Sequence, residues 1–360
     1  MIDSGEKVTP DIAGKNVKKL RPGVDGACVL FSTIIILFVL LGYRIQSKEF
    51  YSGILITEFV IMLLPALVFT AISGVRFKET IRLDKFRPVN IPIVIGIMIF
   101  AIPVATLFNV LNLLVVHSIF GKTVMASLPV AENGVQLLVN ILVIAGSAGI
   151  CEEVLFRGVI QRSFERFGAA GSILLAALLF SLTHLDFQKI LGTFVLGALI
   201  GYIVYRTNSL YCGILAHFTN NAIAVLISYI SGKIMRVFQL SDRTPSGPAD
   251  VSAVFDTFAA LPKEQKVIIF IVYGFIFLFV AIVFILLVYL LTRVNRASSG
   301  TILNDSGLSE GTAAQGTRKG LLWLLPGIIL ILLWFYVQAN GFLGIQNAVT
   351  ETFRSLIGAV

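Results

Sequence analysis

Long runs of apolar residues separated by short polar segments dominate the chain. A helix needs about 20 apolar residues to cross a hydrocarbon core about 30 Å thick. Nine runs approach or exceed this length: Val24–Tyr43, Gly53–Val75, Val89–Val116, Val135–Phe156, Ala169–Leu185, Ile190–Tyr205, Leu210–Ile230, Val267–Thr292 and Leu321–Ala339. The pattern predicts an all-α fold, a polytopic membrane bundle of nine helices, with eight also acceptable because two of the runs are short and nearly fused.

Composition supports a membrane protein over a soluble domain. The 360 residues are 57% hydrophobic and 13% charged, whereas soluble domains are about 45–50% apolar and about 25% charged. Three cysteines, Cys28, Cys151 and Cys212, lie in apolar runs without Cys-x-x-Cys spacing. We expect them to be small packing residues and expect no disulfide framework.

The net charge of +8 bears on partners and orientation. No basic segment with interleaved aromatic residues is present, so we expect loops attracted to anionic lipid and no nucleic-acid partner. Lys and Arg are concentrated in the segments that would be cytoplasmic if the N-terminus is inside. The sequence therefore predicts a multi-pass plasma-membrane protein with a cytoplasmic N-terminus.

Charged residues interrupt the apolar run that begins at Val135. Glu152, Glu153 and Arg157 stand at the end of this run. An ionisable group at membrane depth costs about 2.5–3.5 kcal/mol on insertion scales and commonly marks a functional site. The other interpretation is a helix end, with Glu153 and Arg157 paired one turn apart and Glu152 in headgroup water.

Two other runs carry polar side chains one helical turn apart. Phe180 precedes His184, and His217 precedes Asn221, by four residues in each case. Such pairs share a helix face. Each unpartnered polar group in hydrocarbon costs several kcal/mol, which favours convergence of these groups on one wet cavity. The third histidine, His117, ends its run and is expected at the membrane interface.

The combined groups favour one kind of chemistry. A carboxylate, two imidazoles and an amide supply a general base, orienting groups and an oxyanion donor. This set suits hydrolysis of a carbonyl bond by activated water. Convergence meets one difficulty, because His184 falls near the outer end of its short run while Glu152 and His217 lie toward the inner side. The run must begin deeper, or its helix must be strongly tilted or re-entrant.

Three ordered motifs resemble a known family. They read Glu152-Glu153-x-x-x-Arg157, Phe180-x-x-x-His184 and His217-x-x-x-Asn221. This triple is similar to that of the CAAX-processing type II endopeptidases and bacteriocin-processing proteases, the intramembrane glutamate proteases also called CPBP or Abi. The resemblance covers about residues 135–231. It implies an intramembrane endopeptidase with a conical or buried central polar site.

The resemblance implies a role for four of the motif residues in the reaction. Glu152 would be the general base that activates water, and His184 would help to hold that water. His217 and Asn221 would stabilise the oxyanion. We expect no metal and no other cofactor, and expect the substrate to be a peptide or a membrane protein, with or without a lipid modification.

The remaining motif residues are expected to support the site. The resemblance implies that Glu153 and Arg157 form a structural salt bridge, and their spacing also favours Glu153 over Glu152 as the partner of the arginine. Phe180 would pack beside the site. Two alternatives stay open: a zinc hydrolase with Glu152, His184 and His217 as ligands, and a non-catalytic transporter or immunity protein that retains the motifs.

The segment boundaries follow from these patterns. They are a cytoplasmic tail at 1–23, N-terminal spans at 24–134, a catalytic core at 135–231, a loop at 232–266, and accessory spans at 267–360 with a flexible loop at 298–319. The 232–266 loop holds a breaker cluster of Pro, Ser and Gly at 244–248. The last two spans carry no acids or histidines in their apolar runs, so we expect them to be packing helices.

Overall fold

The computed structural model describes residues 21–125, 129–237, 249–250, 252–296 and 319–358. It is 86% helical. Across these residues, eight helices are long and apolar enough to cross a membrane. The predicted all-α membrane bundle is therefore confirmed. Most of the N-terminal tail, the breaker cluster and nearly all of the 298–319 loop lie outside the described residues.

The first two spans are built from α-helix interrupted by π-helical turns. They comprise α1 (Val24–Leu37), η1 (Phe38–Gly42) and α2 (Tyr43–Lys48), then α3 (Phe50–Ile56), η2 (Thr57–Leu63) and α4 (Leu64–Ile72). Glu49 separates them in an extended conformation, and its carboxylate accepts from the backbone N–H groups of Tyr51 and Ser52. This N-cap satisfies donors at the start of α3 and fixes the turn between the spans.

The central part of the chain is one helical stretch that folds back on itself. After α5 (Phe77–Ile81) and α6 (Asn90–Phe120) come α7 (Gly134–Asn140), η3 (Ile141–Gly146), α8 (Ser147–Glu153), η4 (Val154–Ile160), α9 (Gln161–Phe164), η5 (Glu165–Phe167) and α10 (Gly168–Thr183). Gly168 has φ +80°. The rings of Phe156 and Phe180, twelve residues to either side of it, lie 5.2 Å apart. Gly134–Thr183 therefore holds both of the runs predicted there.

Replacing Gly168 by alanine should weaken this fold-back. Its φ of +80° and ψ of 173° lie in a region that residues with a Cβ rarely adopt, so we expect a loss of about 1–3 kcal/mol of folding free energy. Gly274→Ala is the matched control, since a Cβ there meets open space in a helix. Thermal unfolding in detergent measures both, and equal melting temperatures would contradict the assigned role of Gly168.

The remaining elements complete the bundle. They are α11 (Ile190–Thr207), α12 (Leu210–Val237), α13 (Ser252–Ala260), α14 (Lys263–Val294), η7 (Leu321–Leu324), α17 (Leu325–Leu343) and α18 (Ala348–Ile357), with a two-residue antiparallel pairing of β1 (Val124–Met125) and β2 (Ala249–Asp250). Helix α12 continues past the predicted end of its span at Ile230, and α14 begins before the predicted Val267. Apolar periodicity does not mark these ends, because polar residues can extend a helix beyond the hydrocarbon.

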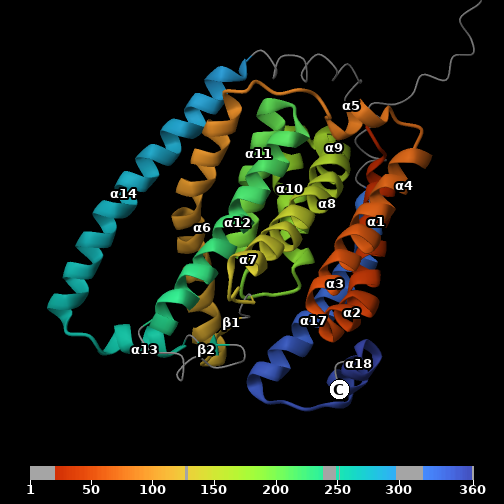
Figure 1. Cartoon of the computed structure of the whole chain (residues 1–360). Coiled ribbons are helices and arrows are strands. Elements are labelled where there is room, and N and C mark those ends of the chain that lie inside the picture. The colour runs from red at the N-terminus through yellow and green to blue at the C-terminus, as the bar shows by residue number, and fades with distance from the viewer. Residues whose placement is uncertain (1–20, 126–128, 238–248, 251, 297–318, 359–360) are drawn as a thin grey trace, which may run out of the picture.

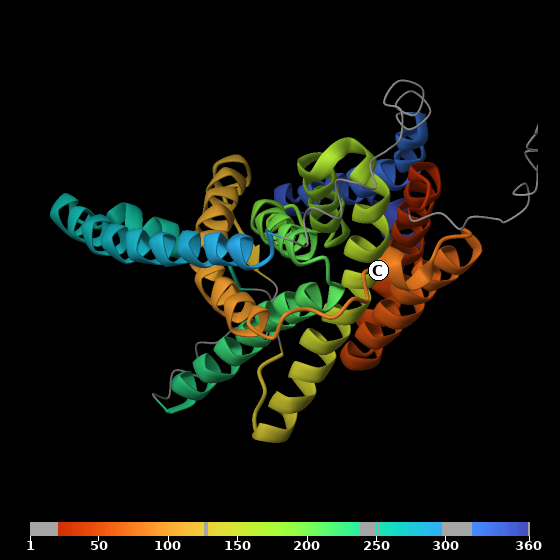
Figure 2. The same cartoon turned by 90° about the horizontal axis from the view of Figure 1, so that it is seen from above.

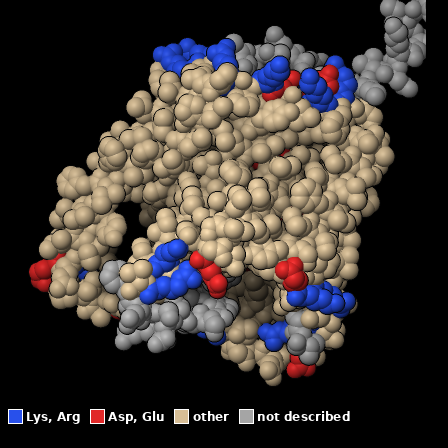
Figure 3. All heavy atoms as spheres, in the orientation of Figure 1, with Lys and Arg blue, Asp and Glu red and all other residues tan. Residues whose placement is uncertain are grey.

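The motif-bearing helices occupy the middle of the bundle. In Figures 1 and 2, α8, α10, α11 and α12 lie between α6 and α14 on one side and α1, α4 and α17 on the other. Figure 3 shows Lys, Arg, Asp and Glu mainly at the two ends of this face of the molecule, with a midsection that is largely free of them. Large apolar side chains are exposed along the helices, among them Phe270, Phe275 and Phe279 on α14. This distribution is typical of a helix bundle surrounded by lipid.

A buried carboxylate ties three segments together at one end of the bundle. Glu165, in η5, pairs with Arg82 and Arg162, and Arg21 lies 3.4 Å from its Oε2 atom. The backbone carbonyl of Arg82 also accepts from the N–H of Leu210 at the start of α12. The short α5 segment is thereby joined to the α9–α10 fold-back and to α12.

Helix α17 supports the turn that carries His184. The indole N–H of Trp334 donates to the carbonyl of Leu185 at 2.8 Å. Leu185 has φ +51°, and the Phe187 ring packs on Phe335 at 6.1 Å. Asn112 on α6 donates to the Phe187 carbonyl from the other side. The turn between α10 and α11 is thus held from two sides, so this predicted accessory span also fixes a motif segment.

Candidate active site

The paired carboxylates stand at the end of α8, where the helix widens into the π-helical η4. Arg157 Nη1 donates to Glu153 Oε1 at 2.6 Å, and the two side chains are 1% and 0% exposed. Arg157 Nη2 donates to the carbonyl of Gly197 on α11 at 2.9 Å. The structure therefore contains the ion pair that the spacing predicts, and the arginine also joins the motif helix to its neighbour. Helical segments with π geometry frequently lie at functional sites.

His217 approaches both carboxylates from α12. Its Nδ1 atom lies 2.8 Å from Glu153 Oε1, and its Nε2 atom lies 4.0 Å from Glu152 Oε2. Glu153 Oε1 thus accepts from both Arg157 and His217, and the imidazole donates through its Nδ1–H. The sequence did not predict the contact between His217 and Glu153. Glu152, with a side chain 12% exposed, keeps its carboxylate free of this ion pair.

Close helix packing allows these contacts. A Cβ at Gly213 on α12 would meet Glu153 Oε2 at 2.9 Å and a Val204 methyl at 2.5 Å. Only glycine fits there without displacing the Glu153 carboxylate. The absence of a side chain one turn before His217 therefore lets α12 approach α8 closely enough for the imidazole to reach both glutamates.

Phe180 is the packing centre of the site. Its ring lies 5.0 Å from the His184 ring, 5.7 Å from the His217 ring and 4.7 Å from the Arg157 guanidinium carbon. Edge-to-face and cation–π contacts of this kind stabilise a fixed arrangement. Phe180 thus lies beside the site, as predicted, and links the histidine of α10 to the histidine of α12.

His184 is the first residue beyond α10. Its Nδ1 atom donates to the Phe180 carbonyl at 3.0 Å, which leaves Nε2 as the free nitrogen, and the side chain is exposed. No direct hydrogen bond joins the described side chains of His184 and Glu152. The predicted Ala169–Leu185 run corresponds to α10, which has 16 residues and is about 24 Å long. The ring of Phe180, in the last turn of α10, contacts the rings of both His184 and His217, so this end of the helix lies beside the other site residues.

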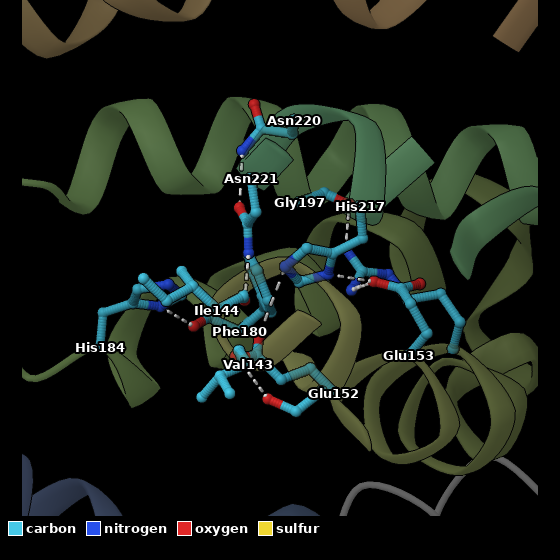
Figure 4. A network of polar contacts seen from close by, with 12 residues as sticks. Val143, Ile144, Glu152, Glu153, Phe180, His184, Gly197, His217, Asn220 and Asn221 are labelled. Carbon is cyan, nitrogen blue, oxygen red and sulfur yellow. Dashed lines mark hydrogen bonds and ion pairs between the residues drawn. The ribbon is translucent and has the colours of Figure 1, made fainter. Parts of the chain in front are cut away.

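Asn221 lies one turn beyond His217 on the same side of α12 (Figure 4). Its Nδ2 atom is 3.5 Å from the carbonyl of Ile144 in η3, and its Oδ1 atom accepts from Asn220 at 3.0 Å. The first contact is at the limit of a hydrogen bond. An incoming acceptor could therefore replace the Ile144 carbonyl at small cost.

Sequence reasoning missed one carboxylate. Glu58, in η2 of the second span, is 7% exposed, and η2 packs against α8, where the Glu58 carboxyl group interacts electrostatically with that of Glu152. Its Oε2 atom is buried without a hydrogen-bond partner among the described residues. The sequence could have indicated this residue, because Glu58 is an acid inside the Gly53–Val75 apolar run. An acid at membrane depth is as costly there as at Glu152 and equally marks a candidate functional residue.

A cavity of about 280 Å³ lies beside the site between α6, α11 and α12. Its lining is mainly apolar, with polar groups from Asn109, Thr193, Lys189 and Asn220. Asn220 is the residue whose amide bonds Asn221, so the cavity adjoins the amide end of the site. An apolar cavity with a few polar groups is typical of a ligand-binding region.

The described residues include no group of three His, Cys, Asp or Glu side chains placed to hold a metal ion. Glu152 and His217 are neighbours, whereas the ring of His184 contacts Phe180, whose own ring contacts His217. The three ligands of the zinc alternative are therefore not assembled as a coordination site.

Comparison with known proteins supports the motif assignment. Residues 134–223 match a family model described as type II CAAX prenyl endopeptidase Rce1-like. This segment runs from α7 into α12 and contains all seven motif residues, which confirms the resemblance over this part of the chain. Glu58 and α17 lie outside it. No curated protein and no solved structure matches the chain.

Proposed function

We propose that this protein is an intramembrane endopeptidase that hydrolyses a peptide bond with water activated by Glu152. The observation that carries the proposal is the buried group of Glu152, Glu153, Arg157 and His217 within the segment that matches a protease family. Glu152 has the freest carboxylate of this group, because Glu153 is already bound by an arginine and a histidine. It is therefore the better base.

The reaction follows from these positions. Glu152 accepts a proton as the water oxygen attacks the scissile carbonyl carbon, and a tetrahedral oxyanion forms. Collapse of this intermediate breaks the C–N bond, and the proton held by Glu152 passes to the leaving nitrogen. The products are a carboxylic acid and an amine, and Glu152 returns to its starting state. His184, whose Nε2 is free, would help to hold the attacking water.

His217 and Asn221 would stabilise the oxyanion. Glu153 accepts from His217 Nδ1, and a second proton on Nε2 would let the imidazole donate to the developing negative charge. The Asn221 amide supplies a second donor once it leaves its 3.5 Å contact with Ile144. In this proposal Glu153 acts indirectly, by fixing the orientation of the His217 imidazole.

The surroundings limit the substrate class. The family match and the apolar spans indicate a lipid environment and protein substrates. The adjoining cavity of about 280 Å³ could take an extended peptide segment or part of an attached lipid. We propose a plasma-membrane location with a cytoplasmic N-terminus, as the distribution of basic residues favours.

A direct assay tests the function. The purified full-length protein is reconstituted in vesicles and given a peptide that ends in a farnesylated CAAX sequence, or the same peptide without the lipid. The products are identified by mass spectrometry. We expect a new C-terminus in at least the farnesylated peptide. His117→Ala is the matched control, since His117 contacts Phe255 away from the site, and it should cleave like the wild type. A wild-type protein that cleaves neither peptide nor native membrane proteins would overturn the proposal.

Chelation separates this mechanism from a zinc-dependent one. Because a carboxylate rather than a metal activates the water, we expect cleavage to continue at an unchanged rate after dialysis against EDTA and in the presence of 1,10-phenanthroline. Elemental analysis of the same sample records its zinc content. A loss of activity that added zinc restores would favour the zinc hydrolase instead.

A further inference from the structure

Glu58 occupies an unusual position for an acid in a membrane span. Its π-helical segment packs against α8, and its side chain is buried beside Glu152. The nearest donors are directed elsewhere, because Arg157 Nη1 and His217 Nδ1 meet Glu153 and Arg157 Nη2 meets the carbonyl of Gly197. Glu58 Oε2 meets no donor among the described residues.

Two buried carboxyl groups in contact constrain each other. Ionised carboxylates only accept hydrogen bonds, so a hydrogen bond between two of them requires a proton on one. Two adjacent negative charges in a region of low dielectric repel strongly, and such pairs hold one proton between them. The contact between Glu58 and Glu152 is therefore best satisfied when one group is protonated and donates to the other.

The other titratable groups near η2 do not change this conclusion. Cys151 on α8 interacts electrostatically with both glutamates but brings no positive charge. Glu153 and Arg157 are paired with each other. Tyr51 on α3 donates to Asn140.

On α1, Asp25 and Cys28 lie close to each other near the start of the helix. No cation from the described elements packed against η2 is therefore directed at Glu58.

We propose that Glu58 is a positioning residue that holds a proton against Glu152, so that Glu152 stays ionised and oriented toward the attacking water. This inference deepens the proposed function and rests on it. The pair begins with one proton, on Glu58. Glu152 gains a second proton from water during attack and gives it to the leaving nitrogen when the C–N bond breaks. The pair then returns to one proton, so protons balance over the cycle.

Infrared spectroscopy tests the shared proton without any need for activity. The wild-type protein in vesicles near neutral pH should show a carbonyl stretch from a protonated, buried carboxyl group. Glu58→Gln should remove it, because the amide then donates to an ionised Glu152. Thr70→Val is the matched control on the same span, since Thr70 is buried and bonds only its own helix at the Ala66 carbonyl. A band unchanged in Glu58→Gln would overturn the proposal.

Activity tests whether the proton matters. Glu58→Leu removes the donor, and we expect kcat to fall about tenfold to a hundredfold, the effect of one hydrogen bond to a charged group. Glu58→Gln keeps a donor and should retain kcat within about threefold. Thr70→Val should behave as the wild type. Thermal unfolding of each variant shows whether a loss of activity reflects a loss of folded protein.

The pH profile separates proton sharing from a purely structural role. Without a donor, ionised Glu152 is less stable, so it is protonated at a higher pH and the acid limb of kcat in Glu58→Leu should move upward by about one to two pH units. The wild type should also lose activity at high pH, when Glu58 ionises beside Glu152. Glu58→Gln should lose less activity there, because its amide cannot ionise, and the loss that remains is assigned to His217.

The outcomes are distinguishable. The inference would be overturned if Glu58→Leu kept the wild-type kcat and the wild-type acid limb of the pH profile. It would also be overturned if kcat fell as far in Glu58→Gln as in Glu58→Leu, because a hydrogen-bond donor at position 58 would then be insufficient. If Glu152→Gln cleaves as well as the wild type, the proposed function fails instead. The infrared result still decides whether the two carboxyl groups share a proton.

Discussion

Replacing Glu152 by glutamine should lower kcat by about 10²–10⁴-fold with little change in KM. Glutamine keeps the size of the side chain and can bond to Glu58, but it cannot accept the proton that the attacking water must lose. Substrate contacts elsewhere in the cavity remain. Single-turnover cleavage of a fluorogenic peptide in vesicles, started by mixing, measures the chemical step separately from binding.

An exposed acid provides the control. Glu132 precedes α7, and its side chain is exposed, so Glu132→Gln removes the same charge outside the site and should leave kcat unchanged. His184→Ala should reduce kcat less than Glu152→Gln does, because it removes a group that only helps to hold the water. Cleavage by Glu152→Gln at the rate of Glu132→Gln would show that another residue is the base.

Replacing Arg157 by methionine should lower the free energy of unfolding by about 3–5 kcal/mol, as expected when one partner of a buried ion pair is removed. Glu153 is 0% exposed, so its charge would remain in the bundle with only His217 as a partner. The carbonyl of Gly197 would also lose its donor. Denaturation of the detergent-solubilised protein, followed by circular dichroism, measures the effect.

The double variant Glu153→Leu with Arg157→Met separates stability from catalysis. Apolar replacement of a whole buried ion pair is often neutral or stabilising, so the double variant should recover most of the stability lost by the single one. It should not recover cleavage, because His217 loses the carboxylate that orients its Nδ1–H. A single variant as stable as the wild type would contradict the structural role of Arg157, and a double variant with wild-type activity would contradict the part given to Glu153.

The helices and the motif residues could be predicted because each leaves a local signal. Apolar length identifies a span regardless of what surrounds it, and a spacing of four residues places Glu153 and Arg157 on one helix face. Helix ends were less predictable, as α12 shows by running to Val237. Polar residues beyond the hydrocarbon can continue a helix or end it with similar ease.

Relations between distant segments left no such signal. The contact between His217 and Glu153 depends on how closely α12 approaches α8, and that distance is set by packing at Gly213. The place of Glu58 beside Glu152 depends on which face of the second span turns inward. Glu58 itself could have been singled out as an acid within an apolar run, but the sequence does not indicate that it lies beside Glu152.

The indole of Trp334 has a consequence for how relatives are compared. A shortened chain that stopped before η7 would retain every motif residue and yet lose the hydrogen bond that steadies the Leu185 carbonyl. His184 would then lie on a turn that is held from one side, by Asn112, and no longer from the other. The presence of all three motifs therefore does not by itself indicate that a shorter homologue is active. A shortened design should keep α17 or replace the hydrogen bond that Trp334 donates to Leu185.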